Sequence, residues 1–327
     1  MQPLLRDFEP EGRLRRLSRE QQIRGEDEVN GVIVIDKPKG YTSFDVCAVV
    51  RKVFHEKKCG HAGTLDPQAT GVLPVFLGSA AKAVDILPAD DKIYLAEMCL
   101  GIETDTEDIF GNVLREVPYT GTKEELTEAI RSFIGTYEQT PPMYSAKKIN
   151  GRKLYELARE GKVIERKAVP VTIHDIQIVS VDLPHAVIRV RCSKGTYIRT
   201  LIADIGKRAG TVACMSALRR EKHGVFDLSD AVTPDMLKDA AEAGNQANFL
   251  KETESVFSSY PGYRVSEDGL KYLLNGNTLF ASNFIEASLD GLSDGTIVRI
   301  CGPDGTFRAL YRYSEENEAF TAYKMFL

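Results

Sequence analysis

Apolar residues in the first part of the chain form short β-branched runs and stretches of helical period. Gly31–Asp36 is a compact Val and Ile run, which predicts a strand that enters a turn at Lys37–Gly40. Ser43 then stands where the N-cap of a helix is expected. The apolar positions of that helix are Phe44, Cys47, Val50, Val53 and Phe54. The pattern therefore predicts a strand, a turn and an amphipathic helix in succession.

The same periodicities predict further helices and strands along the chain. The expected helices are Ser79–Leu87, Thr122–Ile134, Leu154–Arg159 and one from Tyr197 to Gly210. The expected strands are Ile93–Leu100, Val171–Val179 and Ala186–Cys192. Because strands and helices do not alternate in a regular βαβ period, we expect an α+β domain. Its sheet should be mixed or antiparallel and flanked by helices.

The chain changes character after about Asn248. Short β-like pieces follow, separated by the turn dipeptides Asn275-Gly276, Asp294-Gly295 and Asp304-Gly305. We therefore expect a small β-rich C-terminal domain at 249–327, joined through a helical connector to a large domain at 31–248. Residues 1–30 contain six Arg and seven Asp or Glu with few aliphatic residues, which predicts an N-terminal arm rather than core.

The segment Gly60–Pro74 is rich in turn-forming residues. Its three glycines and two prolines predict a loop held between more regular elements. One carboxylate, Asp66, lies at its centre, with no second acid, His or Cys at a metal-ligand spacing. A single Asp fixed in this way is either a turn residue or a nucleophile.

Composition narrows the classes of protein. A length of 327 residues allows two domains, and 43% hydrophobic with 27% charged residues is typical of a globular protein. The six Cys are scattered without a CxxC pair and the five His are dispersed, so we expect reduced cysteines and neither metal nor cofactor. We find no apolar run of membrane-spanning length and no signal-peptide core, and we expect a cytoplasmic protein.

The net charge of −5 conceals a strong asymmetry along the chain. Asp91–Glu138 holds eleven acidic and four basic residues. In contrast, Lys147–Lys167 holds eight basic and three acidic residues, and Arg189–Lys222 holds nine basic and two acidic residues. Because binding to phosphates depends on local clusters of cations, the sequence is compatible with an RNA partner.

Seven blocks of sequence occur in the order found in one known family. They are Gly31–Gly40, Gly60–Pro74, Lys92–Tyr94, Gly101–Asp108, Met143–Ala146, Gly195–Arg199 and Leu218–Arg220. Together they resemble the bacterial TruB family, the tRNA pseudouridine(55) synthases. The C-terminal part resembles the small PUA-like RNA-binding domain of that family. The resemblance implies that residues 31–248 form a pseudouridine synthase domain, which flips uridine 55 of the tRNA T arm and isomerises it without a cofactor.

The resemblance also implies roles for individual residues. Asp66 matches the essential carboxylate, and Arg199 matches the arginine that pairs with it. Tyr94 matches the tyrosine that stacks on the flipped base, and His61 matches the histidine that takes the place of the flipped nucleotide. Tyr197 and Leu218 match positions in the pocket wall. The candidates for phosphate contacts are Lys37, Lys147, Lys148, Arg219 and Arg220.

Two other functions fit parts of the sequence. One is a guide-RNA-dependent pseudouridine synthase acting on ribosomal RNA, although the long basic tails expected there are missing. The other is an RNA-binding or tRNA-folding protein without catalysis, against which the set Asp66, Tyr94 and Arg199 argues. We expect tRNA as the partner, no membrane, no obligate protein partner and a monomer.

Overall fold

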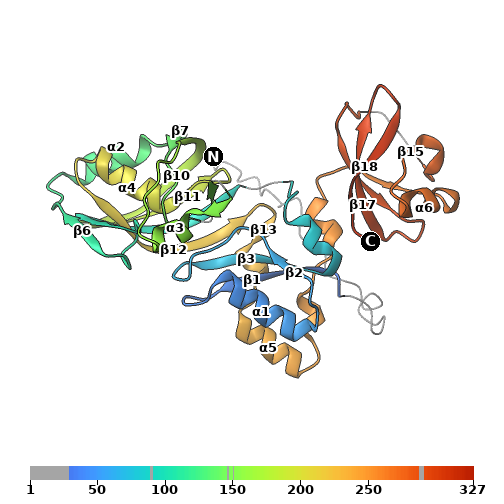
Figure 1. Ribbon diagram of the computed structural model, residues 1–327, viewed down its shortest axis with the longest axis horizontal. Coiled ribbons are helices and arrows are strands. Elements are labelled where there is room, and N and C mark those ends of the chain that lie inside the picture. Colours follow the sequence, from blue (N-terminus) through green and yellow to red (C-terminus); the bar gives the residue numbers. More distant parts are fainter. Residues whose placement is uncertain (1–28, 89–90, 146, 150, 287–290) are drawn as a thin grey trace, which may run out of the picture.

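The computed structural model describes residues 29–88, 91–145, 147–149, 151–286 and 291–327 (Figure 1). Most of the predicted N-terminal arm therefore lies outside the described residues. Within them, no helix is both long and apolar enough to span a bilayer.

A nine-stranded sheet is the framework of the large domain. Its main path runs β1-β3-β12-β4-β11-β10-β7, with β2 added beside β3 and β13 beside β12. Strand β12 pairs in parallel with β3 and antiparallel with β4, so the sheet is mixed, as predicted. The strands are β1 (Gly31–Lys37), β2 (Cys59–His61), β3 (Thr70–Leu77), β4 (Lys92–Leu100), β7 (Gly135–Gln139), β10 (Val169–Asp182), β11 (His185–Cys192), β12 (Ala213–His223) and β13 (Phe226–Asp227).

Helices cover the two halves of this sheet separately. Near β1 and β3, α1 (Ser43–Phe54) and α5 (Pro234–Glu242) bury Val46, Val50 and Leu237 against the strands. At the other end, α2 (Lys123–Arg131) and α4 (Ile198–Arg208) pack on β4, β10 and β11. Figure 1 shows the two helix pairs at opposite ends of the sheet, with strand β12 running between them.

Two short hairpins form separate two-stranded sheets outside the main one. Strands β5 (Ile102–Thr104) and β6 (Val113–Glu116) carry the loop 105–112, and β8 (Lys148–Ile149) and β9 (Arg152–Lys153) lead into α3 (Leu154–Arg159). The remaining elements are the 3₁₀ helices η1 (Gly78–Ala83), η2 (Leu228–Asp230), η3 (Gln246–Phe249), η4 (Thr253–Phe257) and η5 (Ala281–Asn283).

The C-terminal domain has a sheet and a core of its own. Its five strands run in the order β14-β16-β17-β18-β15, with α6 (Glu267–Leu274) beside them. The strands are β14 (Gly262–Arg264), β15 (Leu279–Phe280), β16 (Ile297–Cys301), β17 (Phe307–Ser314) and β18 (Ala319–Met325). Val298, Tyr311 and Phe320 lie at the centre of its core. The predicted β-rich C-terminal domain and the α+β class are thus confirmed.

Aromatic residues join the C-terminal domain to the large one. Phe257 and Phe326 belong to one apolar cluster with Val32 and Phe76 of the large domain. The hydroxyl of Ser79 donates to the Phe326 carbonyl at 3.2 Å.

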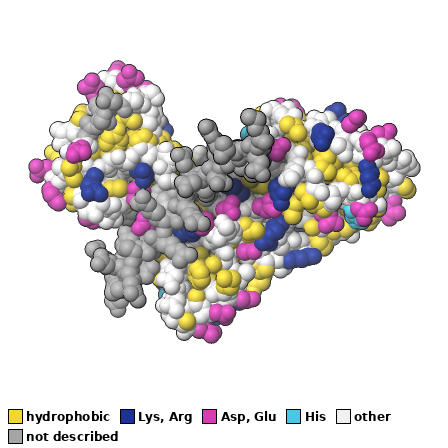
Figure 2. All heavy atoms as spheres, turned by 180° about the vertical axis from the view of Figure 1, so that it is seen from behind, with side chains coloured by type: hydrophobic (Ala, Val, Ile, Leu, Met, Phe, Trp, Pro, Cys, Tyr) yellow, Lys and Arg dark blue, Asp and Glu magenta, His cyan; other side chains and the backbone are white. Residues whose placement is uncertain are grey.

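On the face shown in Figure 2, Lys and Arg side chains are interspersed with Asp and Glu side chains rather than segregated from them.

The structure corrects the predicted start of α1. The N-cap is Thr42, whose hydroxyl accepts from the Asp45 N–H at 3.1 Å while the Asp45 carboxylate accepts from the Thr42 N–H at 2.8 Å. This capping box starts the helix one residue earlier than predicted. Val46 is buried in the core, whereas Phe44, which the prediction places on the apolar face of the helix, is 71% exposed.

Two further expectations differ from the structure. The segment Gly60–Pro74 is a loop only in its middle, because its ends belong to β2 and β3. The expected helix Ser79–Leu87 is the short 3₁₀ helix η1. The shortened loop places Asp66 between two strands that pair with each other, which fixes its position.

Candidate active site

The loop that carries Asp66 is bound on both sides by hydrogen bonds. The Ser43 hydroxyl, at the start of α1, donates to the Leu65 carbonyl at 3.3 Å and accepts from the Leu65 N–H at 3.1 Å. The Gly40 N–H donates to the Pro67 carbonyl at 2.8 Å. The Ala69 N–H donates to the carbonyl of Asp66 itself at 3.0 Å, which closes a tight turn.

Lys37 supports this loop from behind. Its side chain is fully buried, and its ammonium donates to the carbonyls of Pro38, Tyr41 and Pro67 at 3.1, 2.6 and 3.2 Å. Burial lowers the pKa of Lys37 to about 8. A lysine whose three protons are used in this way is not available to a phosphate at the surface. The prediction of a phosphate contact at Lys37 is therefore replaced by a structural role.

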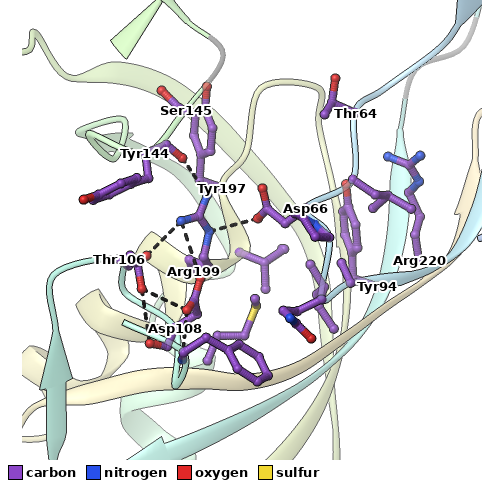
Figure 3. A pocket seen from close by; sticks show the side chains of 18 of the residues that line it. Thr64, Asp66, Tyr94, Thr106, Asp108, Tyr144, Ser145, Tyr197, Arg199 and Arg220 are labelled. Atoms are coloured by element: carbon purple, nitrogen blue, oxygen red, sulfur yellow. Dashed lines mark hydrogen bonds and ion pairs between the residues drawn. The ribbon is translucent and has the colours of Figure 1, made fainter. Parts of the chain in front are cut away.

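Asp66 and Arg199 form an ion pair, as the sequence resemblance implied. Arg199 Nε lies 3.1 Å from Asp66 Oδ2. The arginine side chain is 7% exposed and the carboxylate 44% exposed, so the pair is anchored in protein on one side and open on the other. Figure 3 shows the Asp66 carboxylate directed toward the guanidinium.

The Arg199 guanidinium also has three other acceptors. It donates to the Thr106 carbonyl at 2.8 Å and to the Tyr144 carbonyl at 2.7 Å, and it lies 3.8 Å from Asp108 Oδ2. Asp108 in turn accepts from the Thr106 hydroxyl at 2.8 Å. Because a planar guanidinium with this many partners has one orientation, Arg199 fixes the direction of the Asp66 carboxylate.

Sequence reasoning missed Asp108 as a member of the site. The block Gly101–Asp108 carries part of the resemblance, but the resemblance assigns no role to the separate acids within it. Asp108 comes within reach of Arg199 because the loop 105–112 is attached to β12. There the Met215 N–H donates to the Glu107 carbonyl at 3.0 Å, and the Ile109 N–H donates to the Met215 carbonyl at 2.8 Å.

Tyr94 lies on β4 next to Arg220 on β12. The two residues are paired in the antiparallel register, and Tyr94 is 7% exposed. Burial raises the pKa of the Tyr94 hydroxyl, so the phenol is neutral at physiological pH. Arg220 is 1% exposed and donates to the carbonyls of Val72 and Gly63 at 2.8 and 2.7 Å. Arg220 therefore braces the wall of the site and is not a surface contact for phosphate, contrary to the prediction.

Tyr197 and Leu218 line the same cavity as Asp66. Tyr197 is the N-cap of α4, and its backbone is held by Gln139, whose side chain accepts from the Tyr197 N–H at 2.8 Å and donates to its carbonyl at 3.0 Å. Leu218 projects from β12, and its carbonyl accepts from the Thr70 hydroxyl at 3.5 Å. The two residues thus come from separate elements that meet at the site.

These residues surround a cavity of about 660 Å³ (Figure 3). The predicted catalytic residue Asp66 lines it, with the predicted pocket residues Tyr94, Tyr197, Arg199 and Leu218. Asp108 and the half-exposed Phe110 line it as well. A cavity of this size is within the range of small-ligand sites and offers an apolar wall beside one oriented carboxylate. Among the described residues, no group of three His, Cys, Asp or Glu side chains could hold a metal ion.

The other predicted RNA contacts lie around this cavity rather than in it. His61 packs edge-on against Phe44, with ring centroids 5.8 Å apart. Arg219 is partly exposed and pairs with Asp36 at 2.7 Å. Lys147 is half-buried at the start of the β8–β9 hairpin, and the side chain of Lys148 lies outside the described part of the structure. These residues stay predictions as RNA contacts.

Comparison with known proteins identifies the family. The model for the N-terminal domain of TruB family pseudouridylate synthases matches residues 51–198. The model for the C-terminal domain of tRNA pseudouridylate synthase B matches residues 199–256. A tRNA pseudouridine synthase B from Lachnoclostridium phytofermentans is 42% identical over 307 residues, 91% of this chain and 100% of that protein. This chain belongs to the TruB family.

Other TruB-related proteins resemble the chain over similar lengths. A tRNA pseudouridine synthase B from Alkaliphilus oremlandii is 46% identical over 258 residues, which is 79% of this chain and 85% of that protein. Among solved structures, a chain of an H/ACA ribonucleoprotein bound to a substrate RNA containing 2′-deoxyuridine matches with a TM-score of 0.67 and 25% identity. That match covers 91% of this chain and 85% of the other.

Proposed function

We propose that this chain isomerises uridine 55 in the T arm of tRNA to pseudouridine. Membership of the TruB family supports the class of reaction, and the name shared by its relatives, tRNA pseudouridine synthase B, supports tRNA as the substrate. One structural observation carries the proposal: the Asp66 carboxylate is fixed by Arg199 at 3.1 Å beside a cavity that can hold a nucleoside.

The geometry is suited to a nucleotide that leaves its stack. A uridine within a folded T loop has to be extruded before a side chain can reach its glycosidic bond. In the cavity its base stacks on Tyr94, and Tyr197 and Leu218 close the pocket around it. The neutral Tyr94 phenol adds no charge next to the Asp66 carboxylate, which leaves that carboxylate as the nucleophile or base.

The reaction is an isomerisation, so its atoms balance without a co-reactant. The bond between C1′ and N1 breaks, the base turns, and a bond between C1′ and C5 forms. The hydrogen on C5 leaves as a proton, and N1 gains one. Asp66 assists this exchange by attacking the sugar or the base carbon, or by taking a proton from the sugar. Arg199 holds the carboxylate in one direction toward the bound nucleoside, whichever of these routes it takes.

We further propose that the chain acts without a guide RNA or a partner protein, as a monomer. The 42% identity to a relative named as a tRNA enzyme, against 25% to the ribonucleoprotein chain, supports tRNA as the natural substrate. A purified chain incubated with an unmodified tRNA transcript, and no other RNA or protein, tests this directly. Pseudouridine formation under those conditions supports the proposal.

Release of tritium from tRNA containing 5-tritiated uridine tests the reaction itself. We expect the wild type to release tritium and Asp66→Asn to release none, because the amide is neither a nucleophile nor a base. The Asp66→Asn variant should still bind tRNA, since the carboxylate is a small part of the contact surface. Full tritium release by Asp66→Asn, or none from a folded wild type, would contradict the proposed function.

A further inference from the structure

The outer side of α1 presents an aromatic ring followed by cations, and the reaction proposed above uses none of them. Phe44 is 71% exposed. The other exposed residues on this side are Ala48, Arg51, Lys52 and His55. Their spacing from Phe44 places them along one stripe of the helix. We call these five residues the α1 face.

The ring of Phe44 is held in place rather than left mobile at the surface. It meets the His61 ring edge to face, with an interplanar angle of 86°. His61 Nδ1 is buried and has no hydrogen-bond partner among the described residues. The two rings line a groove of about 360 Å³ together with Arg51. One side of the Phe44 ring is thus available to a planar partner, next to an unsatisfied polar atom.

The α1 face begins where the active-site cavity ends. Ser43, the neighbour of Phe44, is the residue whose hydroxyl binds the main chain of Leu65. Leu65 lines the cavity, and so does Gly63, two residues after His61. A strand of RNA that leaves the cavity past this loop therefore meets the Phe44 ring first and the α1 cations next.

The charges of the α1 face complement a phosphate backbone. Arg51, Lys52 and Lys57 surround a second depression of about 350 Å³ at the end of the helix. None of these three cations forms an ion pair with a carboxylate in the described part of the chain, in contrast to Lys238 on the neighbouring α5, which pairs with Asp235 at 2.8 Å. The acids nearby are Asp45, Glu56 and Asp85. The Asp45 carboxylate accepts from the Thr42 N–H at 2.8 Å, and Glu56 accepts from the Lys58 N–H at 2.7 Å.

We propose that the α1 face is an RNA-binding surface outside the catalytic cavity. A nucleobase next to the everted uridine stacks on Phe44, and the phosphates that follow it bind Arg51 and Lys52. Aromatic stacking combined with a row of cations is how proteins hold unpaired nucleotides whatever their sequence. This inference rests on the proposed function, because it extends the contact of the same RNA, and it assigns no part in the chemistry to α1.

Binding of unmodified tRNA to the Asp66→Asn protein, in which no turnover occurs, provides the test. We expect Phe44→Ala in that background to weaken binding by about 5- to 100-fold, the range for loss of one base–aromatic stack. Phe44→Trp should retain the affinity. Met236→Ala removes a side chain that is 50% exposed on α5 and should leave binding unchanged. With Asp66 intact, Phe44→Ala should raise KM and leave kcat near that of the wild type.

The cations are tested separately through the salt dependence. Replacing Arg51 and Lys52 together by Gln should reduce the slope of log K against log salt by about 1 to 2, the value for two phosphate contacts. Lys238→Gln serves as the control and should not change the slope.

Wild-type affinity in Phe44→Ala, or an unchanged slope in the Arg51 and Lys52 double variant, would overturn the inference. Either result leaves the proposed function standing as long as the wild type releases tritium. A wild type that binds tRNA but releases no tritium would contradict the function, and its binding would still test the α1 face. The two failures are thus distinguishable.

Discussion

Arg199 reaches four acceptors from a single planar group. Nε faces Asp66, the terminal nitrogens face the carbonyls of Thr106 and Tyr144, and Asp108 lies 3.8 Å away. A lysine keeps the charge but has one nitrogen, which cannot point in these directions at once. The orientation of the Asp66 carboxylate therefore depends on the guanidinium shape as well as on its charge.

We predict that Arg199→Lys lowers kcat by roughly 100-fold, the cost of misplacing a catalytic group by about 1 Å. It should also lower the free energy of unfolding by about 1–3 kcal/mol, because a buried carbonyl loses its donor. Single-turnover pseudouridine formation and urea unfolding measure the two effects. Arg219→Lys is the matched control, since that guanidinium is partly exposed beside Asp36. A kcat equal to that of the wild type in Arg199→Lys would remove the geometric argument.

The loop 105–112 is the element that brings the second carboxylate to the site, and Glu107 is its half-buried anchor. The Thr200 hydroxyl donates to Glu107 Oε2 at 2.6 Å. Burial raises the pKa of the Glu107 carboxyl above its ordinary value of 4.5. The folded state therefore binds more protons at this position than the unfolded state does, over the pH range between 4.5 and the raised value.

We predict that the free energy of unfolding falls as pH rises through that range. The folded state holds the Glu107 proton more tightly than the unfolded state does, so loss of this proton costs the folded state more. Glu107→Gln has no proton to lose and keeps an acceptor for Thr200. Relative to the wild type, this variant should gain stability as pH rises above 4.5 and level off beyond the raised pKa. Urea unfolding at a series of pH values measures the difference. Glu116→Gln, which is exposed on β6, should show no such trend, and a pH-independent difference for Glu107→Gln would contradict the assignment.

Sequence patterns predicted most of the elements and erred where local hydrogen bonds compete with periodicity. Helix α3 begins and ends where predicted, and β1 extends one residue further. In α1 the pattern predicts Ser43 as the cap, and the capping box between Thr42 and Asp45 starts the helix one residue earlier. Strand β12 was not predicted, because its polar residues Arg219 and Arg220 read as a basic surface segment. However, β12 lies inside the main sheet. Arg220 is buried there, and its guanidinium donates hydrogen bonds to backbone carbonyls.

At the site too, sequence motifs alone do not separate residues that face the cavity from residues that support it. Asp66, Tyr94 and Arg199 belong to strong sequence motifs, and all three line the cavity. Lys37 and Arg220 belong to equally strong motifs, but the structure shows them buried against backbone carbonyls. A sequence does not distinguish a lysine that binds phosphate from one, such as Lys37, that donates to three backbone carbonyls, because the same turn-forming residues can flank both. Only the burial of the side chain separates the two roles.

At the scale of the whole molecule, the two domains share part of one core. Phe326, 7% exposed, belongs to one apolar cluster with Val32 and Phe76 of the large domain. The C-terminal domain also has a separate core around Val298 and Tyr311. The shared cluster therefore helps to hold the two domains together, beside the hydrogen bond from Ser79 to the Phe326 carbonyl.

We predict that Phe326→Ala weakens this junction by about 3–5 kcal/mol, the cost of removing a buried phenylalanine side chain. Calorimetry should then resolve a separate, earlier transition for the C-terminal domain, while tritium release at saturating tRNA persists. Leu327→Ala is the control, because that side chain is 46% exposed. A single transition at the wild-type temperature in Phe326→Ala would show that other contacts hold the domains together.

The net charge of −5 makes the source of RNA affinity a question for the whole molecule. Attraction to tRNA has to come from local cations, and the β8–β9 hairpin supplies a group of them beside the cavity. The Lys147 carbonyl accepts from the Leu154 N–H at 2.9 Å, which closes the hairpin, and Tyr144 just before it binds Arg199. Cations on this hairpin would therefore lie close to the RNA that enters the site.

We predict that replacing Lys147 and Lys148 together by Ala weakens tRNA binding and reduces the slope of log K against log salt by about 1 to 2. The rate of the chemical step at saturating tRNA should change little, because phosphate contacts position the RNA without touching the reacting atoms. Removing Lys123 on α2 and Lys238 on α5 takes away the same charge from other surfaces and should leave the slope unchanged. If both double variants reduce the slope equally, the attraction is a property of the overall charge, and the hairpin has no special part in binding.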